Sequence, residues 1–205
     1  MDPALAELAL TTRGFMPHEE GLGLYRAVCQ VGSSGPVVEI GSYCGKSTVY
    51  LAAAALEVGS TVFTVDHHRG SEEMQAGWDH HDSSLVDPST GRMDSLPALR
   101  RTLEAGGIED VVVAVVGDAV TVARHWTTPA AMVFIDGGHG TEPAHADYEG
   151  WSPRVMQGGL LALHDVFPNP ADGGRPPYEI FRRALDSGSF VEHDEVGSLR
   201  VLRRV

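Results

Sequence analysis

Short apolar runs alternate with helix-like segments along most of this chain. The strand-like runs cover residues 36–40, 61–65, 111–116, 130–135 and 159–163, and the helix-like segments cover residues 17–30, 47–56, 96–105, 120–125, 144–156 and 178–185. Parallel strands need crossover connections, which are usually helices that cover the faces of the sheet. The pattern therefore predicts a doubly wound, mostly parallel α/β sheet. Residues 190–192 and 199–202 resemble a hairpin that closes this sheet.

The composition suits one domain with neither a nucleic-acid nor a membrane partner. A chain of 205 residues fills a single domain, 1–205, in which residues 1–35 form a helical segment outside the sheet. The net charge of −13 argues against the basic surface that nucleic acids require. No apolar run approaches the ~20 residues of a membrane span. Two cysteines, Cys29 and Cys44, and an acidic N-terminus without a secretory signal favour a cytoplasmic location.

One connection, residues 67–94, is unusually long for a compact domain. Loops of this length are usually functional or disordered, and this one leaves the carboxyl end of a strand, where ligands bind in open α/β sheets. It contains Trp78, His80 and His81, beside several acids. A planar aromatic ring with polar neighbours suits a sugar. We expect an acceptor-binding loop, with Tyr43 as a further contact, although a surface insertion has the same composition.

A glycine-rich turn joins the first strand to the next helix. It contains Glu39, Gly41, Ser42, Gly45 and Ser47. Only three residues separate the two glycines, whereas a P-loop needs four, and Glu39 would repel a triphosphate. The dinucleotide pattern of three glycines is also absent. A carboxylate at this turn instead suits a ligand with ammonium and sulfonium charges.

Acidic residues follow the next two strands in a similar position. Asp66 ends the second strand and is followed by His67, and Asp118 and Ala119 follow the third strand. A carboxylate at the end of the second strand can accept hydrogen bonds from a ribose diol, as in other nucleoside-binding α/β folds. A carboxylate after the third strand can contact an adenine amino group. Together these acids predict a nucleoside site.

A second cluster of polar residues follows the fourth and fifth strands. Asp136 and His139 come after the fourth strand, and His164 and Asp165 follow the fifth. Adjacent carboxylates need a cation, or one of them must stay protonated. Oxygen ligands favour Mg²⁺, whereas a histidine ligand suits transition metals better. We therefore expect Asp136, His164 and Asp165 to bind a metal. The alternative is that the acids cap helices and His164 is a core residue.

The whole pattern resembles the class I S-adenosylmethionine-dependent methyltransferases over about residues 37–202. This resemblance implies a Rossmann-like sheet of seven strands with a reversed last strand, and S-adenosyl-L-methionine as the cofactor. The implied cofactor-binding residues are Glu39, Gly41, Ser42, Gly45, Ser47, Asp66, His67, Asp118, Ala119 and Asp136.

A later part of the chain resembles one subgroup of that superfamily. The residues that carry this resemblance are the segment from Ile135 to His139, then Asp147, Trp151, Gly158, Gly159, His164 and Asp165. The subgroup includes macrocin-type and cephamycin-pathway enzymes and other small O-methyltransferases. These enzymes commonly bind Mg²⁺ through an acid at position 136 and an acidic pair at positions 164 and 165. Here His164 departs from the pair, which leaves the third ligand open. The chain is also similar to small actinobacterial methyltransferases that cap methylmannose polysaccharide at a sugar O1.

We therefore expect methyl transfer to a sugar hydroxyl of a small-molecule or oligosaccharide acceptor. The predicted base is His139, with His164 second, because a neutral imidazole suits proton transfer near neutral pH. A bound Mg²⁺ at Asp136 would stabilise the alkoxide. Methylation of a catechol or another natural-product hydroxyl is the alternative, and a non-catalytic cofactor-binding protein is a third. We also expect a homodimer, the commonest oligomer.

Overall fold

The computed structural model describes residues 1–75, 77, 81–138, 140–169 and 171–205. Its strands form one seven-stranded sheet in the order β3-β2-β1-β4-β5-β7-β6. The strands are β1 (Val37–Ile40), β2 (Val62–Asp66), β3 (Val112–Val116), β4 (Ala130–Ile135), β5 (Val155–Leu163), β6 (Phe190–Val196) and β7 (Leu199–Arg204).

Six of these strands run in the same direction, and β7 runs against both of its neighbours, β5 and β6. The predicted doubly wound sheet with a reversed last strand is therefore confirmed. Ile40 pairs with Val65 of β2 and with Ile135 of β4. Because this register aligns the carboxyl ends of the central strands, the segments that follow β1, β2 and β4 meet at one edge of the sheet.

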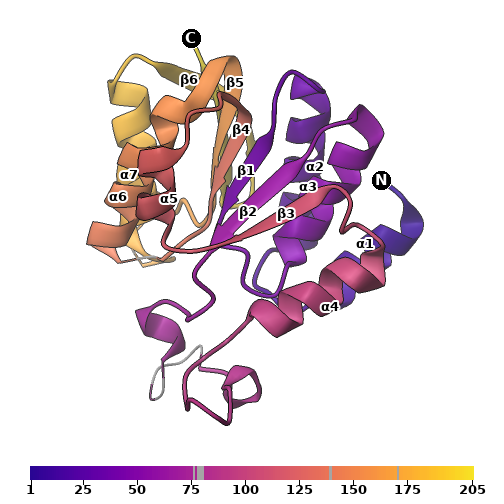
Figure 1. Ribbon diagram of the computed structural model, residues 1–205. Helices are drawn as coiled ribbons and strands as arrows, with labels where there is room; N and C mark the ends of the chain where they lie inside the picture. Colours follow the sequence, from indigo (N-terminus) through magenta and orange to yellow (C-terminus); the bar gives the residue numbers. More distant parts are fainter. Residues whose placement is uncertain (76, 78–80, 139, 170) are drawn as a thin grey trace.

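Two layers of helices cover the sheet (Figure 1). One face carries α1 (Pro3–Thr11), α2 (His18–Val31), α3 (Lys46–Val58) and α4 (Leu96–Gly106), and the other carries α5 (Ala119–His125), α6 (Thr141–Trp151) and α7 (Arg175–Asp186). The central strands β1 and β4 are buried along their whole length, as the strands of a doubly wound sheet must be. No helix among the described residues is long and apolar enough to cross a bilayer.

Several elements differ from the sequence prediction, and three of these differences have a clear local cause. Residues 144–156 do not form one helix, because α6 ends at Trp151, a 3-10 turn follows at Ser152–Arg154, and β5 begins at Val155. Pro153 lacks the N–H that a helix interior needs, which explains the early end. Conversely, α7 begins at Arg175, three residues early, because prolines fit the first turn of a helix. Helix α1, which was not predicted, is capped by Asp2.

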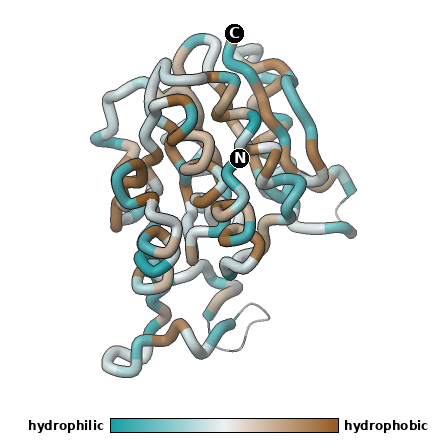
Figure 2. Tube along the Cα trace, turned by 90° about the vertical axis from the view of Figure 1, so that its right-hand side faces the viewer, coloured by the Kyte–Doolittle hydropathy of each residue, from teal (hydrophilic) through white to brown (hydrophobic). Residues whose placement is uncertain are grey.

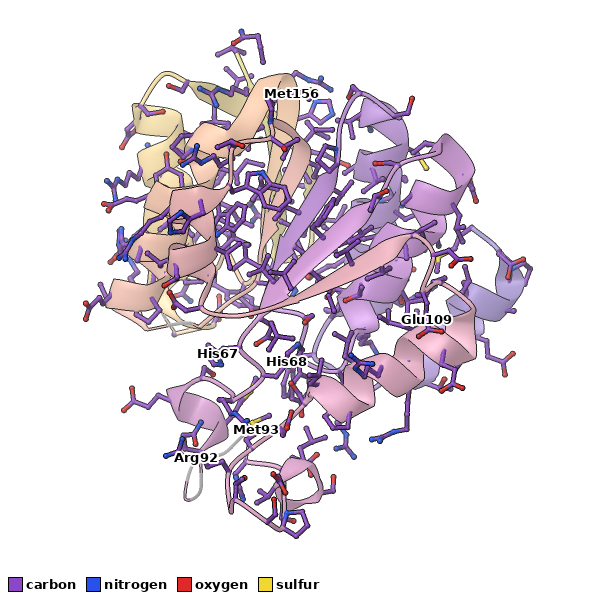
Figure 3. All side chains as sticks on the ribbon, viewed as in Figure 1. His67, His68, Arg92, Met93, Glu109 and Met156 are labelled. Atoms are coloured by element: carbon purple, nitrogen blue, oxygen red, sulfur yellow. The ribbon has the colours of Figure 1, made fainter. Side chains whose placement is uncertain are left out.

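The segment between Asp66 and α4 extends beyond the body of the molecule at the carboxyl ends of the strands (Figure 1). Its described part contains two 3-10 turns, Glu72–Met74 and Ser83–Leu85, and an antiparallel bridge between Val86 and Met93. Figure 2 shows that this part is mostly teal or pale. In Figure 3, His67 and His68 lie at the end of β2 from which the segment leaves, and Met156 lies at the far end of the sheet.

Candidate functional site

A cavity of about 850 Å³ lies at the carboxyl ends of the parallel strands. Its volume is in the range of small-molecule sites, 300–1,000 Å³. The cavity is lined by the segments that follow five strands, including Gly41, Ser42, Ser47, Asp66, His67, Asp118, Ala119, Asp136, His164 and Asp165. The structure therefore brings together most of the residues that the sequence predicted for the cofactor and the metal.

Gly41 begins the turn that forms the floor of this cavity. Its φ of 88° lies in the region that favours glycine, and a Cβ there would collide with the carbonyl oxygen of Asp136. The turn therefore lets the backbone of β1 approach the segment after β4. Lys46, at the start of α3, donates a hydrogen bond from Nζ to the carbonyl oxygen of Thr12, at 3.2 Å. Lys46 thus binds the N-terminal segment, in agreement with the exclusion of a P-loop.

Glu39 lies beneath the glycine turn and does not line the cavity. Its side chain is fully buried, and its two oxygens accept hydrogen bonds from Ser47 Oγ and Thr48 Oγ1, both at 2.6 Å. Burial raises the pKa of Glu39 to about 7 despite these hydrogen bonds. In place of the predicted contact with the cofactor, Glu39 connects β1 to the first turn of α3, and so fixes the glycine turn between them.

Asp66 holds the same turn from the cavity side. Its Oδ2 accepts hydrogen bonds from the backbone N–H groups of Ser42, at 3.0 Å, and Tyr43, at 2.9 Å. Its Oδ1 accepts a hydrogen bond from the N–H of His68, at 2.7 Å. A carboxylate oxygen has lone pairs for more than one donor. Asp66 therefore orders the turn and remains able to accept hydrogen bonds from a ligand.

Asp118 caps helix α5 at the far side of the cavity. Its Oδ1 accepts hydrogen bonds from the N–H of Thr121, at 2.8 Å, and from Thr121 Oγ1, at 2.7 Å. These hydrogen bonds lower the pKa of Asp118, so it is a carboxylate at neutral pH. Its Oδ2 receives no hydrogen bond from the described residues. Capping thus positions Asp118 and leaves one oxygen for a ligand.

Asp136, His164 and Asp165 form a compact cluster at the other end of the cavity. One potential ligand atom from each of them lies within 4.8 Å of the other two. His164 Nδ1 lies 3.0 Å from Asp136 Oδ1 and 3.4 Å from Asp165 Oδ2. Asp165 has a φ of 54°, an uncommon backbone conformation for a residue other than glycine that often marks a functional site. The predicted juxtaposition of these three residues is confirmed.

The second nitrogen of His164 contacts a residue that the sequence did not indicate. Nε2 lies 2.7 Å from Oε2 of Glu20, a buried residue of α2. Burial alone would lower the pKa of His164, but the charge of Asp136 and the hydrogen bonds to Asp136, Asp165 and Glu20 outweigh it and raise the pKa to about 12. His164 is therefore an imidazolium that donates from both nitrogens. In this state it cannot act as the second base that we predicted.

The chemistry of the cluster fits a divalent cation. Asp136 and Asp165 supply the oxygen ligands that Mg²⁺ prefers, and both line the cavity. His164 can add a nitrogen ligand from Nδ1 once that atom loses its proton. Glu20 would then accept from the remaining Nε2–H, as outer carboxylates do for metal-bound histidines. Without an ion, the imidazolium of His164 supplies the positive charge that this acidic cluster needs.

Aromatic and sulfur-containing side chains from the N-terminal segment, the glycine turn and the long segment after β2 form an apolar wall of the cavity. The rings of Phe15 and Tyr43 stack with a centroid distance of 5.9 Å and an interplanar angle of 22°, and both line the cavity with Met16 and Met74. Tyr43 was predicted as an acceptor contact. Phe15 was not predicted, although it is 59% exposed. Ligand pockets are lined mainly by apolar and aromatic side chains, and exposed apolar groups often mark such sites.

Six of the predicted residues lie away from the cavity or outside the described residues: besides Glu39, Gly45 does not line the cavity. His81 does not line the cavity, and its Nδ1 lies 3.1 Å from the carbonyl oxygen of Met74. Trp78, His80 and His139 lie outside the described residues. Their predicted roles in acceptor binding and proton transfer therefore stay predictions.

Comparison with known proteins identifies the family of the chain. A methyltransferase domain matches residues 38–166. Among solved structures, the O-methyltransferase TomG of Streptomyces achromogenes, involved in tomaymycin synthesis and in complex with SAM, is 16% identical, with a TM-score of 0.66 over 100% of this chain and 91% of TomG. An O-methyltransferase of Bacillus cereus in complex with SAH is 19% identical, with a TM-score of 0.65 over 100% of this chain and 92% of its own.

A third solved structure is similar to the same extent. The SAH-bound methyltransferase PaMTH1 of Podospora anserina is 14% identical, with a TM-score of 0.69 over 100% of this chain and 89% of its own. At these identities the three structures show a shared fold. The family follows from the sequence match, which spans more than half of the chain: this protein belongs to the methyltransferase domain family.

Proposed function

We propose that the protein transfers the methyl group of S-adenosylmethionine to a hydroxyl oxygen of a small acceptor. The observation that carries this proposal is that one cavity joins the nucleoside-type residues Asp66 and Asp118 to the cluster of Asp136, His164 and Asp165. A nucleoside cofactor and a cation-bound hydroxyl can therefore meet in the same space. The likeness to O-methyltransferases in complex with SAM or SAH supports this cofactor.

The cofactor would lie across the glycine turn. Asp66 can accept hydrogen bonds from the ribose hydroxyls, and Asp118 Oδ2 can accept one from the adenine amino group. The turn that begins at Gly41 lets the backbone approach the methionine part of the cofactor closely. Ser42, which lines the cavity beside it, can donate a hydroxyl hydrogen bond to the methionine carboxylate, whereas the Ser47 hydroxyl already donates to Glu39.

A divalent cation would be held by Asp136 and Asp165, with His164 as a third ligand. When bound, it would act as a Lewis acid that makes the acceptor hydroxyl more acidic. The remaining work is alignment and proton transfer: the bond between sulfur and the methyl carbon breaks as the bond from oxygen to carbon forms. Alignment supplies ~7–11 kcal/mol at best. His139, three residues after Asp136, is the proposed base.

The apolar side chains of the cavity favour an acceptor with an aromatic ring. Phe15, Met16, Tyr43 and Met74 give this wall of the cavity an apolar surface, and a phenolic ring would pack against it. A sugar hydroxyl, such as the 1-OH of a mannoside in methylmannose polysaccharide, is the second candidate. It is favoured by Glu72 and Glu142, which line the cavity and can accept hydrogen bonds from sugar hydroxyls.

An acceptor screen with a labelled methyl donor tests this function. Catechols, other phenols, manno-oligosaccharides, gluco-oligosaccharides and macrolide sugars would each be incubated with the protein and Mg²⁺. Labelled product with one class identifies the acceptor, and the Asp136→Ala variant should abolish that label while Glu149→Gln, on the outer side of α6, should retain it. Binding of the cofactor without transfer to any of these classes would favour the non-catalytic alternative. Sedimentation would show whether the protein is a homodimer.

A further inference from the structure

Asp147, in the middle of α6, is a buried carboxyl group without a partner. Its exposed fraction is 7%, and it lines the cavity. Among the residues that the structure describes, none forms a hydrogen bond or an ion pair with it. Its oxygens are not among the fully enclosed atoms without a partner, so they reach the space of the cavity. A largely buried carboxyl group with no protein partner in a native structure usually has a functional cause. A group that the fold leaves unsatisfied inside a ligand cavity is therefore a candidate ligand contact.

The space around the carboxyl group is kept open by a glycine. A Cβ on Gly137 would lie 2.7 Å from Asp147 Oδ2, so any other residue at position 137 would meet the carboxyl group. Gly137 directly follows Asp136 and lines the cavity as well. The absence of a side chain at Gly137 thus makes room for the carboxyl group of Asp147 at the cavity.

Helix α6 is fixed against the segment that carries Asp118. Trp151, one turn after Asp147, donates a hydrogen bond from Nε1 to the carbonyl oxygen of Ala119, at 3.1 Å. Trp151 is fully buried and packs against Trp126, which follows α5. Burial raises the pKa of Asp147 to about 7, and the charge of Asp118 adds to this shift. The Trp151 hydrogen bond therefore holds α6 beside the residue that follows Asp118, and the carboxyl groups of Asp147 and Asp118 both line the cavity.

We propose that Asp147 accepts a hydrogen bond from the 6-amino group of the cofactor's adenine, and that Asp118 accepts the second one. This inference rests on the proposed function. An exocyclic amino group carries two N–H donors, and two carboxyl groups with free oxygens match them. A 6-oxo base has no N–H at this position, so neither acid would receive its hydrogen bond, and the oxygen lone pairs of the base would face the charged carboxylate of Asp118. Asp147 is then a specificity-determining residue that selects adenine over hypoxanthine or guanine.

Binding of two ligands tests this role. S-adenosylhomocysteine and S-inosylhomocysteine, in which a 6-oxo group replaces the 6-amino group, would be titrated calorimetrically into the wild-type protein and two variants. Asp147→Asn keeps the size of the side chain and adds an N–H that can donate to a 6-oxo group. Glu149→Gln changes an acid on the exposed side of the same helix and serves as the matched control.

We expect the wild-type protein and Glu149→Gln to bind S-adenosylhomocysteine at least about tenfold more tightly than S-inosylhomocysteine. A site whose acceptors are arranged for an N–H group of the ligand rejects an analogue that lacks this group. In Asp147→Asn this ratio should fall toward one or reverse. An unchanged ratio in Asp147→Asn, equal weakening of both ligands, or no preference in the wild-type protein would overturn the inference. Failure of the wild-type protein to bind either ligand would instead contradict the proposed function.

Discussion

Glu20 Oε2 lies 2.7 Å from His164 Nε2, although the two residues are 144 positions apart in the chain. Glu20 is further held by the N–H of Ser198, at 2.7 Å, just before β7. The N-terminal helix α2 and the reversed strand thus meet behind the candidate metal cluster. The position of His164 between Asp136 and Glu20 is therefore fixed by three distant parts of the chain.

Loss of the His164 charge should destabilise the protein strongly. His164→Gln would leave Glu20 and Asp136 without the cation between them, and removing one partner of a buried ion pair costs about 3–5 kcal/mol. Urea unfolding at neutral pH measures this change. The matched control is His125→Gln on the exposed end of α5, which should change the free energy of unfolding by less than about 0.5 kcal/mol. Equal effects of the two substitutions would contradict the buried pair.

Binding of a divalent cation should release a proton. The pKa of His164 is raised to about 12 without an ion, so Nδ1 must lose its proton before it can ligate a metal. The affinity for Mg²⁺ or Mn²⁺ should therefore rise with pH, and EDTA should suppress methyl transfer. Calorimetry in two buffers of different ionisation enthalpy counts the protons released. Asp165→Asn should weaken ion binding at least about tenfold. Binding without proton release would exclude His164 as a ligand.

Asp147 should make the ligand-free protein less stable at neutral pH than in mild acid. Its pKa is raised from 3.8 to about 7 by burial and by Asp118. Its contribution to stability is therefore fully present below about pH 4 and is lost as the pH rises toward 7. The free energy of unfolding of Asp147→Asn minus that of the wild-type protein should grow over this window by up to about 4 kcal/mol. A difference that does not depend on pH would contradict the buried, unpaired carboxyl group.

A salt bridge joins the N-terminal segment to the long segment after β2. Arg13 Nη1 lies 2.6 Å from Asp82 Oδ2 and 2.8 Å from Ser84 Oγ. Because both charged side chains are partly exposed, Arg13→Gln should lower stability by no more than about 1 kcal/mol. Arg13 and Phe15 both line the cavity, so the same variant should raise the KM for the acceptor and leave cofactor affinity unchanged. Arg26→Gln, on the exposed face of α2, is the control. Steady-state kinetics of both variants measure the KM for the acceptor, and equal values would contradict the role of Arg13.

The parts of the site that were predictable from the sequence are those that follow strands. Asp66, Asp118 and Asp136 each follow an apolar run, and the parallel register brings the ends of such runs to one edge. The position of Glu39 was predictable, but its contact was not. Whether a side chain at the end of a strand faces the cavity or the neighbouring helix depends on the pleat and on local partners, here Ser47 and Thr48.

The parts that were missed come from helices. Glu20 lies on the buried face of α2 with Leu24, Ala27 and Val28, and Asp147 lies on the buried face of α6 with Ala144, Tyr148 and Trp151. A charged residue within an apolar helical stripe is the signal that could have indicated both. Their partners could not be predicted, because they depend on how each helix packs against segments far away in the chain.

The central claim is that the cavity binds S-adenosylmethionine for methyl transfer, and calorimetric titration of S-adenosylhomocysteine tests it most directly. The wild-type protein should bind with a dissociation constant in the micromolar range. Gly41→Val, which places a side chain against the Asp136 carbonyl, should remove binding. A wild-type protein that is folded by circular dichroism and gives no binding heat at several temperatures would contradict the account.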